Sequence, residues 1–376
     1  SCAPANATPA CVTVLPSPAQ PAGINGASVN VCRGRVEPYS VVNPQVGVTY
    51  NWTVSPGGPT LSAVTGTNIT VTWNAVGVYT LSVTPVQAGC VGPQRDLVVD
   101  VVDIPAQPGP IAGPTPLCAG LGGTYTIAPV AGAVDYVWGA LPAGAAYVGP
   151  TNGTSVNINF TSAGTYDLSV QARNTCGTSP ARTLTVTINP VPLAPVPVPA
   201  NPVCPGQLGA TVSVTNVVGM TYTWTAPAEA TISSGQGTST LTVNWSAAAT
   251  PGVKTFSVYA TSAAGCVGPS VNVDVVMQDP PPGQVSGVTG PTPVCRGAIG
   301  TYQAGAAARA TNHIWTGIPA GASVVGYSGA ANEEITINWG SAATGAYVLF
   351  VRGVNSCGQG PQQGFLVRVE DIPAQP

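Results

Sequence analysis

The stretch "AVDYVWGA", residues 133–140, decides the fold class, because its residues alternate with the two-residue period of a β-strand. That period places Tyr136 and Trp138 on one face of the strand. Four neighbouring runs alternate in the same way: 123–130, 154–160, 164–174 and 182–188. Turn residues separate these runs, and Pro and Gly interrupt every candidate helix. The segment is therefore predicted to form a β-sandwich of about 90 residues.

The cysteines show that this segment is one of four repeats. Cys32 and Cys90, like Cys118 and Cys176, are 58 residues apart, while Cys204 and Cys266, like Cys295 and Cys357, are 62 apart. A tryptophan follows the first cysteine of each pair by 20 residues in every repeat. A second large aromatic follows about 20 residues later. We expect these eight aromatic residues to anchor the four cores: Trp52, Trp138, Trp224, Trp315, Trp73, Phe160, Trp245 and Trp339.

Ten cysteines at long, equal separations are typical of disulfides in an oxidising compartment, since a zinc site needs closely spaced pairs that this sequence lacks. We expect each disulfide to lie within one repeat, and linkage between neighbouring repeats is the alternative. The expected pairs are Cys32–Cys90, Cys118–Cys176, Cys204–Cys266 and Cys295–Cys357, with Cys2–Cys11 as a further candidate.

The hexapeptide "DIPAQP" occurs at 103–108 and again at 371–376, each time after the last predicted strand of a repeat. Proline fixes φ, so this hexapeptide is predicted to stiffen a joint between repeats. The joint residues are Asp103, Pro105, Pro108, Asp371, Pro373 and Pro376. Residues 1–21 align with 356–376 and end in "SPAQP", so they are predicted to be the last strand and linker of a preceding repeat.

The composition excludes several classes of function. Charged residues make up 6% of the 376 residues and the net charge is −3, so no basic surface exists for nucleic acid. No run of 18 apolar residues predicts a membrane span. The single histidine, His313, occupies a position that is tyrosine in the other repeats, and a catalytic triad or zinc site has no second histidine. We therefore expect no enzymatic activity.

Metal binding is a weaker alternative. Carboxylates gather near the ends of final strands, and calcium takes six to eight oxygen ligands. Each joint offers only one or two of these acidic residues, so structural calcium is the less favoured interpretation and no other cofactor is expected. The candidates are Asp100, Asp103, Asp279, Glu370 and Asp371.

The repeats resemble PKD-like (polycystic kidney disease-type) domains. In the second repeat the resemblance is carried by "CAGLGGTYTI", "DYVWGALPAGA", "VNINF" and "GTYDLSVQARNTCG", and the fourth repeat matches with "HIWTGIPAGA" and "ITINWG". It implies an all-β tandem array of four Ig-like/PKD-like β-sandwiches. The expected segments are 1–21 (strand and linker of a preceding repeat), 22–104, 105–190, 191–279 and 280–376, the last with a C-terminal linker.

The resemblance also implies a function. Such arrays are found in long surface proteins of Bacteroidota, commonly secreted adhesins exported by type IX secretion and linked to gliding or attachment. We therefore expect a disulfide-stapled rod or filament segment at the cell surface, whose partners are the neighbouring repeats, laterally associated arrays or surface glycans. Two alternatives stay open: carbohydrate-binding modules, and accessory domains of a secreted hydrolase.

Overall fold

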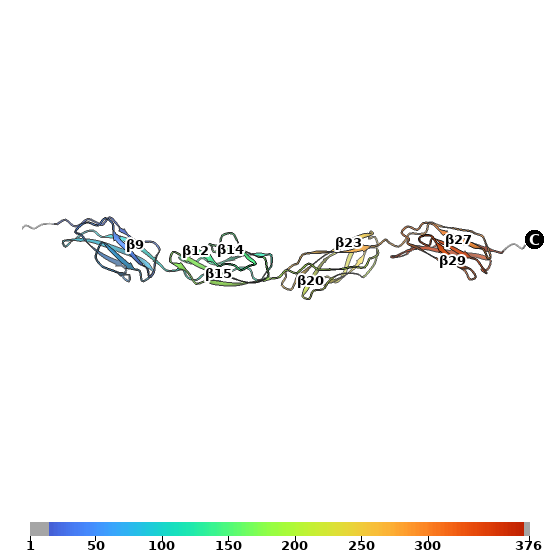
Figure 1. Ribbon diagram of the computed structural model, residues 1–376, viewed down its shortest axis with the longest axis horizontal. Helices are drawn as coiled ribbons and strands as arrows, with labels where there is room; N and C mark the ends of the chain where they lie inside the picture. Colours follow the sequence, from blue (N-terminus) through green and yellow to red (C-terminus); the bar gives the residue numbers. More distant parts are fainter. Residues whose placement is uncertain (1–14, 372–376) are drawn as a thin grey trace, which may run out of the picture. The chain divides into compact units, whose positions relative to one another are not determined.

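The computed structural model describes residues 15–371, and every regular element among them is a β-strand (Figure 1). The chain divides into two compact units, Ser1–Pro190 and Val191–Pro376. Each unit holds two β-sandwiches, named here S1 and S2 in the first unit and S3 and S4 in the second. The predicted all-β fold of four tandem sandwiches is confirmed.

The first unit contains β1 to β17. In S1 one sheet has the order β1-β3-β6-β5 and the other β2-β9-β7-β4, with β8 paired to β7. In S2 the sheets are β11-β14-β13 and β10-β17-β15-β12, with β16 paired to β15. The strands of S1 are β1 (Ile24–Asn25), β2 (Val31–Cys32), β3 (Val36–Val41), β4 (Thr49–Ser55), β5 (Thr60–Leu61), β6 (Asn68–Thr72), β7 (Gly77–Gln87), β8 (Cys90–Val91) and β9 (Arg95–Val102). Those of S2 are β10 (Leu117–Cys118), β11 (Gly122–Thr126), β12 (Asp135–Trp138), β13 (Ala145–Val148), β14 (Ser155–Phe160), β15 (Gly164–Asn174), β16 (Gly177–Thr178) and β17 (Arg182–Asn189).

The second unit contains β18 to β33. S3 has the sheets β18-β19-β22-β21 and β20-β23-β24, and S4 has β25-β27-β30-β29 and β26-β33-β31-β28, with β32 paired to β31. The strands of S3 are β18 (Pro197–Val198), β19 (Ala210–Val214), β20 (Met220–Thr225), β21 (Ala230–Ser234), β22 (Thr240–Trp245), β23 (Gly252–Ser262) and β24 (Val271–Met277). Those of S4 are β25 (Val288–Thr289), β26 (Val294–Cys295), β27 (Ile299–Ala304), β28 (Asn312–Thr316), β29 (Ser323–Ser328), β30 (Glu334–Asn338), β31 (Gly345–Asn355), β32 (Gly358–Gln359) and β33 (Gln363–Glu370).

Alternation along the strands fills each core. In β14 the side chains of Val156, Ile158 and Phe160 are buried, while the residues between them are exposed. The eight aromatic residues expected in the cores are all buried, two in each sandwich. Burial of one such side chain contributes roughly 1.5–3 kcal/mol, so the aromatic pairs are major sources of stability.

In S1, S3 and S4 the second aromatic is a tryptophan, whose buried Nε1–H needs a hydrogen-bond acceptor. The Trp73 Nε1–H donates to Tyr39 Oη at 3.2 Å, and the Trp339 Nε1–H donates to Tyr302 Oη at 3.0 Å. In S3 the residue at the register position of Tyr39 is Val212, and Trp245 Nε1 has no hydrogen-bond partner. One tyrosine-to-valine difference therefore leaves a buried donor unpaired.

The predicted boundaries at 104/105, 190/191 and 279/280 each lie in a strand-free segment. The strand predicted in 1–21 falls largely on residues 1–14, which lie outside the described part of the chain. Residues 15–21 contain no strand. The five runs predicted in the second repeat correspond to strands, but a further strand, β13, lies between the second and third of them, and the two-residue strands β10 and β16 are also additional. The missed strand β13 matters for the disulfides.

Candidate functional site: the joints between sandwiches

Disulfides join consecutive sandwiches within each unit. Cys32 of S1 is bonded to Cys176 of S2, with 5.4 Å between their Cα atoms, and Cys204 of S3 is bonded to Cys357 of S4, with 5.5 Å. All four pairings predicted within single repeats are therefore wrong, because each includes one of these four cysteines. The wrong pairs are Cys32–Cys90, Cys118–Cys176, Cys204–Cys266 and Cys295–Cys357.

The two cysteines of one sandwich lie at opposite ends of it. In the sheet, Cys32 of β2 lies opposite Val102 at the end of β9, and Val101 lies opposite Gly77, where β7 begins. Cys90 follows the other end of β7, which is 11 residues long. At about 3.3 Å per residue the separation is roughly 33 Å, whereas disulfide-bonded cysteines have Cα atoms about 4.4–6.8 Å apart. A bond within the sandwich is geometrically impossible.

The missed strand explains the error in physical terms. Successive strands of these sandwiches run in alternating directions, so the number of strands between two cysteines decides whether they lie at the same end. Four predicted strands between Cys118 and Cys176 would place the two cysteines at the same end. With β13 included, five strands separate them and they lie at opposite ends.

The remaining cysteines fall into three groups. Cys118 and Cys266 are also disulfide-bonded. Cys90 and Cys295 are free thiols, the second of them exposed. The candidate pair Cys2–Cys11 lies outside the described residues.

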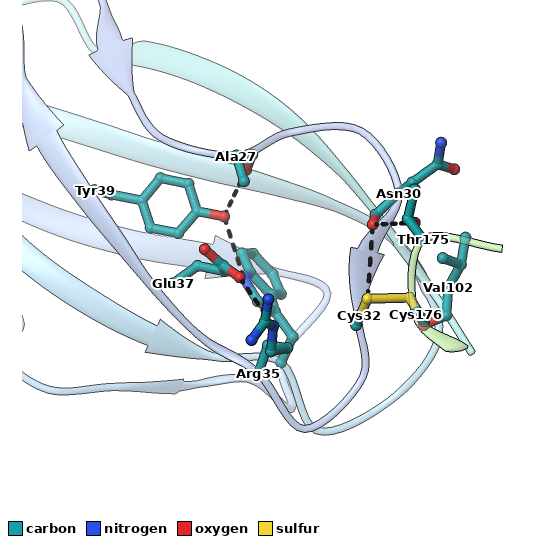
Figure 2. Close-up of polar contacts among 10 residues, drawn as sticks. Ala27, Asn30, Cys32, Arg35, Glu37, Tyr39, Val102, Thr175 and Cys176 are labelled. Carbon is teal, nitrogen blue, oxygen red and sulfur yellow. Dashed lines mark hydrogen bonds and ion pairs between the residues drawn. A yellow bond between two sulfur atoms is a disulfide. The ribbon is translucent and has the colours of Figure 1, made fainter. Parts of the chain in front are cut away.

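Figure 2 shows the first joint, where the disulfide lies beside the backbone carbonyl oxygens of Asn30 and Val102 in S1. Thr175 Oγ1 donates to the carbonyl oxygen of Asn30 at 3.5 Å, and Cys176 Sγ lies 3.9 Å from the carbonyl oxygen of Val102. The turn between β15 and β16 thus lies against the end of S1 from which the chain leaves. We call the end of a sandwich from which the chain leaves its exit end. The opposite end, where S2 carries its β15–β16 turn, is the entry end.

Asp103 connects both sandwiches at this joint. Its carboxylate accepts a bond from Arg33 Nη2 at 2.7 Å, and its carbonyl oxygen accepts one from Asn174 Nδ2 at 2.8 Å. Asn174 Oδ1 in turn accepts from the backbone N–H of Cys176 at 2.8 Å. The amide therefore holds the bonded cysteine and the linker together.

The second joint repeats this arrangement in the other unit. Asn355 Nδ2 donates to the carbonyl oxygen of Pro280 at 2.8 Å, and Asn355 Oδ1 accepts from the N–H of Cys357 at 2.9 Å. Gln278 Oε1 lies 3.8 Å from Cys204 Sγ and 3.6 Å from Cys357 Sγ. The same asparagine, two residues before the bonded cysteine, thus positions both joints.

The linkers are docked on the sandwich that follows them. Each contains two buried residues three positions apart, and all but one of these eight residues are proline: Pro18 and Pro21, Pro105 and Pro108, Pro192 and Pro195, Pro282 and Val285. An extended polyproline-type segment has three residues per turn, so residues three apart face the same side. The proposed joint stiffener is therefore also a packing element, with both prolines of residues 103–108 in contact with protein.

Polar contacts and a close approach fix the docked linkers. Gln107 Nε2 donates to the carbonyl oxygen of Ala181 at 2.7 Å, and Gln20 Nε2 donates to that of Gln94 at 2.6 Å. A Cβ added at Gly92 would lie 2.3 Å from the carbonyl oxygen of Pro18, so only glycine fits beneath that linker. The side chain of Ile104 is 45% exposed and lies beside Gly177 of the next sandwich.

The other predicted joint residues belong to the end of S4. The Asp371 carboxylate forms an ion pair with Arg296 Nη2 at 3.2 Å. Pro373 and Pro376 lie outside the described residues.

Residues 15–371 contain no group of three or more His, Cys, Asp or Glu that could hold a metal ion. Among the calcium candidates, Asp103 and Asp371 form ion pairs with arginines.

His313 is buried in β28, with Nδ1 at 2.9 Å from the carbonyl oxygen of Ala331. That position packs the ring inside S4. Residues 15–371 contain no helix that is long and apolar enough to cross a membrane.

One ion pair in S3 strongly lowers the pKa of a carboxyl group. Glu229 bonds to Lys254 Nζ and accepts from the N–H of Thr250 at 2.9 Å and from Thr250 Oγ1 at 3.0 Å. These bonds, with Lys254 the largest contributor, lower the pKa of Glu229 from 4.5 to about 2. The group is ionised throughout the physiological range and tightens a turn of S3.

Several solved structures are similar to parts of the chain at low sequence identity. The I67–I69 fragment of the titin I-band is 12% identical, covering 68% of this chain and 96% of that one, with a TM-score of 0.36. Invasin, a bacterial integrin-binding protein, is 15% identical over 92% of this chain and 79% of its own, with a TM-score of 0.28. The insect immune protein hemolin is 11% identical over 93% and 99%, with a TM-score of 0.25.

Among curated proteins, none matches the chain in sequence. The model of the PKD-like domain matches it four times, at residues 17–99, 104–186, 191–275 and 281–367. Each match begins within or beside a docked linker and ends in the last strand of a sandwich. The linker is thus part of the domain that follows it. The chain belongs to the PKD-like domain family, of which it contains four tandem copies.

Proposed function

We propose that the chain is a load-bearing structural segment of an extracellular adhesin or filament at the cell surface, and not an enzyme. The observation that carries the proposal is the disulfide between consecutive sandwiches. Disulfides persist in oxidising, extracellular environments. The resemblance to Bacteroidota surface proteins extends the proposal to attachment or gliding after type IX secretion.

The bonds change the path that tension takes through the protein. When the chain is pulled from its ends, force entering at Cys32 passes through the disulfide to Cys176, and force entering at Cys204 passes to Cys357. The bonds span 144 and 153 residues, so the sequence between their cysteines cannot be drawn out. Most of both sandwiches in each unit lies in these segments and is shielded from unravelling.

The proposal is tested by pulling single molecules from their ends, oxidised and reduced. A residue contributes about 3.3–3.6 Å when extended, so each released segment adds about 500 Å and the two together add about 1000 Å. We expect reduction to add this length to the fully extended chain. The Cys90→Ser variant, which removes a free thiol, should behave as the parent does. An oxidised chain that extends as far as the reduced one would contradict the load-bearing role.

No specific observation favours carbohydrate binding. All seven tryptophans are buried, and Tyr327 is the one aromatic among the exposed large hydrophobic residues of the described chain. Exposed aromatic side chains in loops would favour a carbohydrate-binding site, because small-molecule sites are lined mainly by apolar and aromatic side chains. Glycan contacts and lateral association between arrays therefore stay predictions.

A further inference from the structure

The two free cysteines occupy positions at which other sandwiches of this chain form disulfides. Cys295 pairs with Glu370 in the parallel bridge of β26 and β33, just as Cys32 pairs with Val102 in that of β2 and β9. Both cysteines therefore lie at the exit end of their sandwiches. Cys32 is bonded to the next sandwich and Cys295 is not.

The surroundings of Cys295 reproduce those of Cys32. The residue after each cysteine is an arginine whose N–H donates at 2.9 Å to the carbonyl oxygen at the end of the last strand. Each arginine also forms an ion pair with the aspartate of the hexapeptide "DIPAQP": Arg33 with Asp103, and Arg296 with Asp371. The exit end of S4 thus has the same local structure as the end of S1 on which S2 is docked.

Cys90 is the complementary case, at the entry end of S1. Cys90 is the first residue of β8, directly after the turn of the β7–β8 hairpin, and Cys176 is the last turn residue before β16 in the matching hairpin of S2. The Cys90 Sγ lies 3.7 Å from the carbonyl oxygen of Leu15. The corresponding distance from Cys176 to Val102 is 3.9 Å. Gln20 holds the linker before S1 as Gln107 holds the linker before S2, in both cases by a bond to a residue 74 positions on. The linker that would guide a preceding sandwich is already in place.

We propose that Cys295 and Cys90 are the two complementary halves of the same kind of joint. Cys295 forms a disulfide with the entry-end cysteine of a PKD-like sandwich placed after S4, and Cys90 forms one with the exit-end cysteine of a sandwich placed before S1. The inference deepens the proposed function, on which its mechanical consequence rests, by naming the partner: another domain of the same family carrying the same cysteine. Bonds of this kind make the array covalently continuous through its sandwiches.

Bond formation needs an oxidant, and a low-molecular-weight disulfide such as oxidised glutathione supplies it. The Cys295 thiolate attacks one glutathione sulfur, forms a mixed disulfide and releases one glutathione thiolate. The thiolate of the entry-end cysteine then attacks Cys295 Sγ and displaces the second glutathione. Two protein thiols and one glutathione disulfide thus give one protein disulfide and two glutathione thiols.

A tandem chain tests both halves at once. Pro376 is followed directly by a second copy that begins at Ala22, so the junction "DIPAQPAG" closely matches the natural "SPAQPAG" of residues 17–23. Cys2 and Cys11 are replaced by serine throughout. After refolding with oxidised glutathione at low protein concentration, we expect Cys295 of the first copy to be bonded to Cys90 of the second. Peptide mapping identifies the bond, and the number of thiols that react with iodoacetamide falls from the four expected of two separate copies to two.

The control is the same tandem chain with Cys295→Ser in its first copy. Cys90 of the second copy should then stay reactive while the Cys32–Cys176 and Cys204–Cys357 bonds form as before. The proposal is overturned if Cys295 and the second Cys90 both remain thiols in the parent tandem, or if that Cys90 is bonded within its own sandwich. The measurement applies no force, so this failure would leave the load-bearing role of the two observed bonds intact.

Discussion

Replacement of Cys32 by serine should destabilise two sandwiches at once. Cys176 lies beside Val102, where S1 ends and the linker begins. While S2 is folded, the disulfide therefore ties Cys32 to this point and closes the chain of S1 into a loop of about 70 residues. With S1 folded, Cys32 lies beside Val102, and Cys176 closes a loop of 74 residues in S2. In the chain-entropy model each loop contributes about 4 kcal/mol to the free energy of unfolding. One bond between sandwiches thus acts on each as an internal staple would.

Amide hydrogen exchange, resolved by peptide, measures the loss of stability in each sandwich separately. A loss of about 4 kcal/mol raises the opening constant about a thousandfold. We expect this acceleration in β7 of S1, with an increase of similar order in β15 of S2. The Cys90→Ser variant is the matched control, since it changes a free thiol in S1, and its effect should stay within about 0.5 kcal/mol.

Two results would refute the reasoning. Exchange in β7 that rises by less than about tenfold in Cys32→Ser would show that the loop is not constrained as described. Acceleration in S1 with no change in S2 would show that the bond does not couple the two sandwiches.

Three further changes test the docked linker, the core and the charges. Gly92→Ala should lower the stability of S1 by about 1–3 kcal/mol in denaturant unfolding, because the new Cβ displaces the linker. Tyr39→Phe should cost about 1–3 kcal/mol, because it leaves the buried Trp73 N–H without an acceptor. Glu229→Gln should destabilise S3 at pH 7. Because the folded pKa of Glu229 is about 2, its contribution is complete above pH 4.5 and is lost between pH 4.5 and 2, so variant and parent should converge at low pH.

Matched variants control these measurements. Gly57→Ala adds a Cβ that meets nothing within 4 Å, so it should be neutral or slightly stabilising, and an equal loss in Gly57→Ala and Gly92→Ala would contradict a steric cause. Tyr125→Phe removes a hydroxyl that donates to Pro114 but accepts from no tryptophan, so it should cost less than Tyr39→Phe. A pH-independent effect of Glu229→Gln would show that the ion pair is not its source.

The sequence by itself determined the local structure and the composition of the cores. The two-residue alternation around Trp138 predicted strands, because side chains of a strand alternate between its faces whatever the rest of the chain does. The repeat spacing of cysteine and tryptophan predicted four sandwiches and the aromatic residues at their centres. These features depend on residues close together in the sequence.

Only the tertiary structure decided which cysteines meet. A short strand such as β13 has little pattern of its own, yet it reverses the chain and moves the second cysteine to the opposite end of the sandwich. The same arrangement brings the end of one sandwich to the beginning of the next, where a linker with two inward-facing prolines holds them in register. Cys32 therefore bonds to Cys176, 144 residues away, and not to the cysteine of its own repeat.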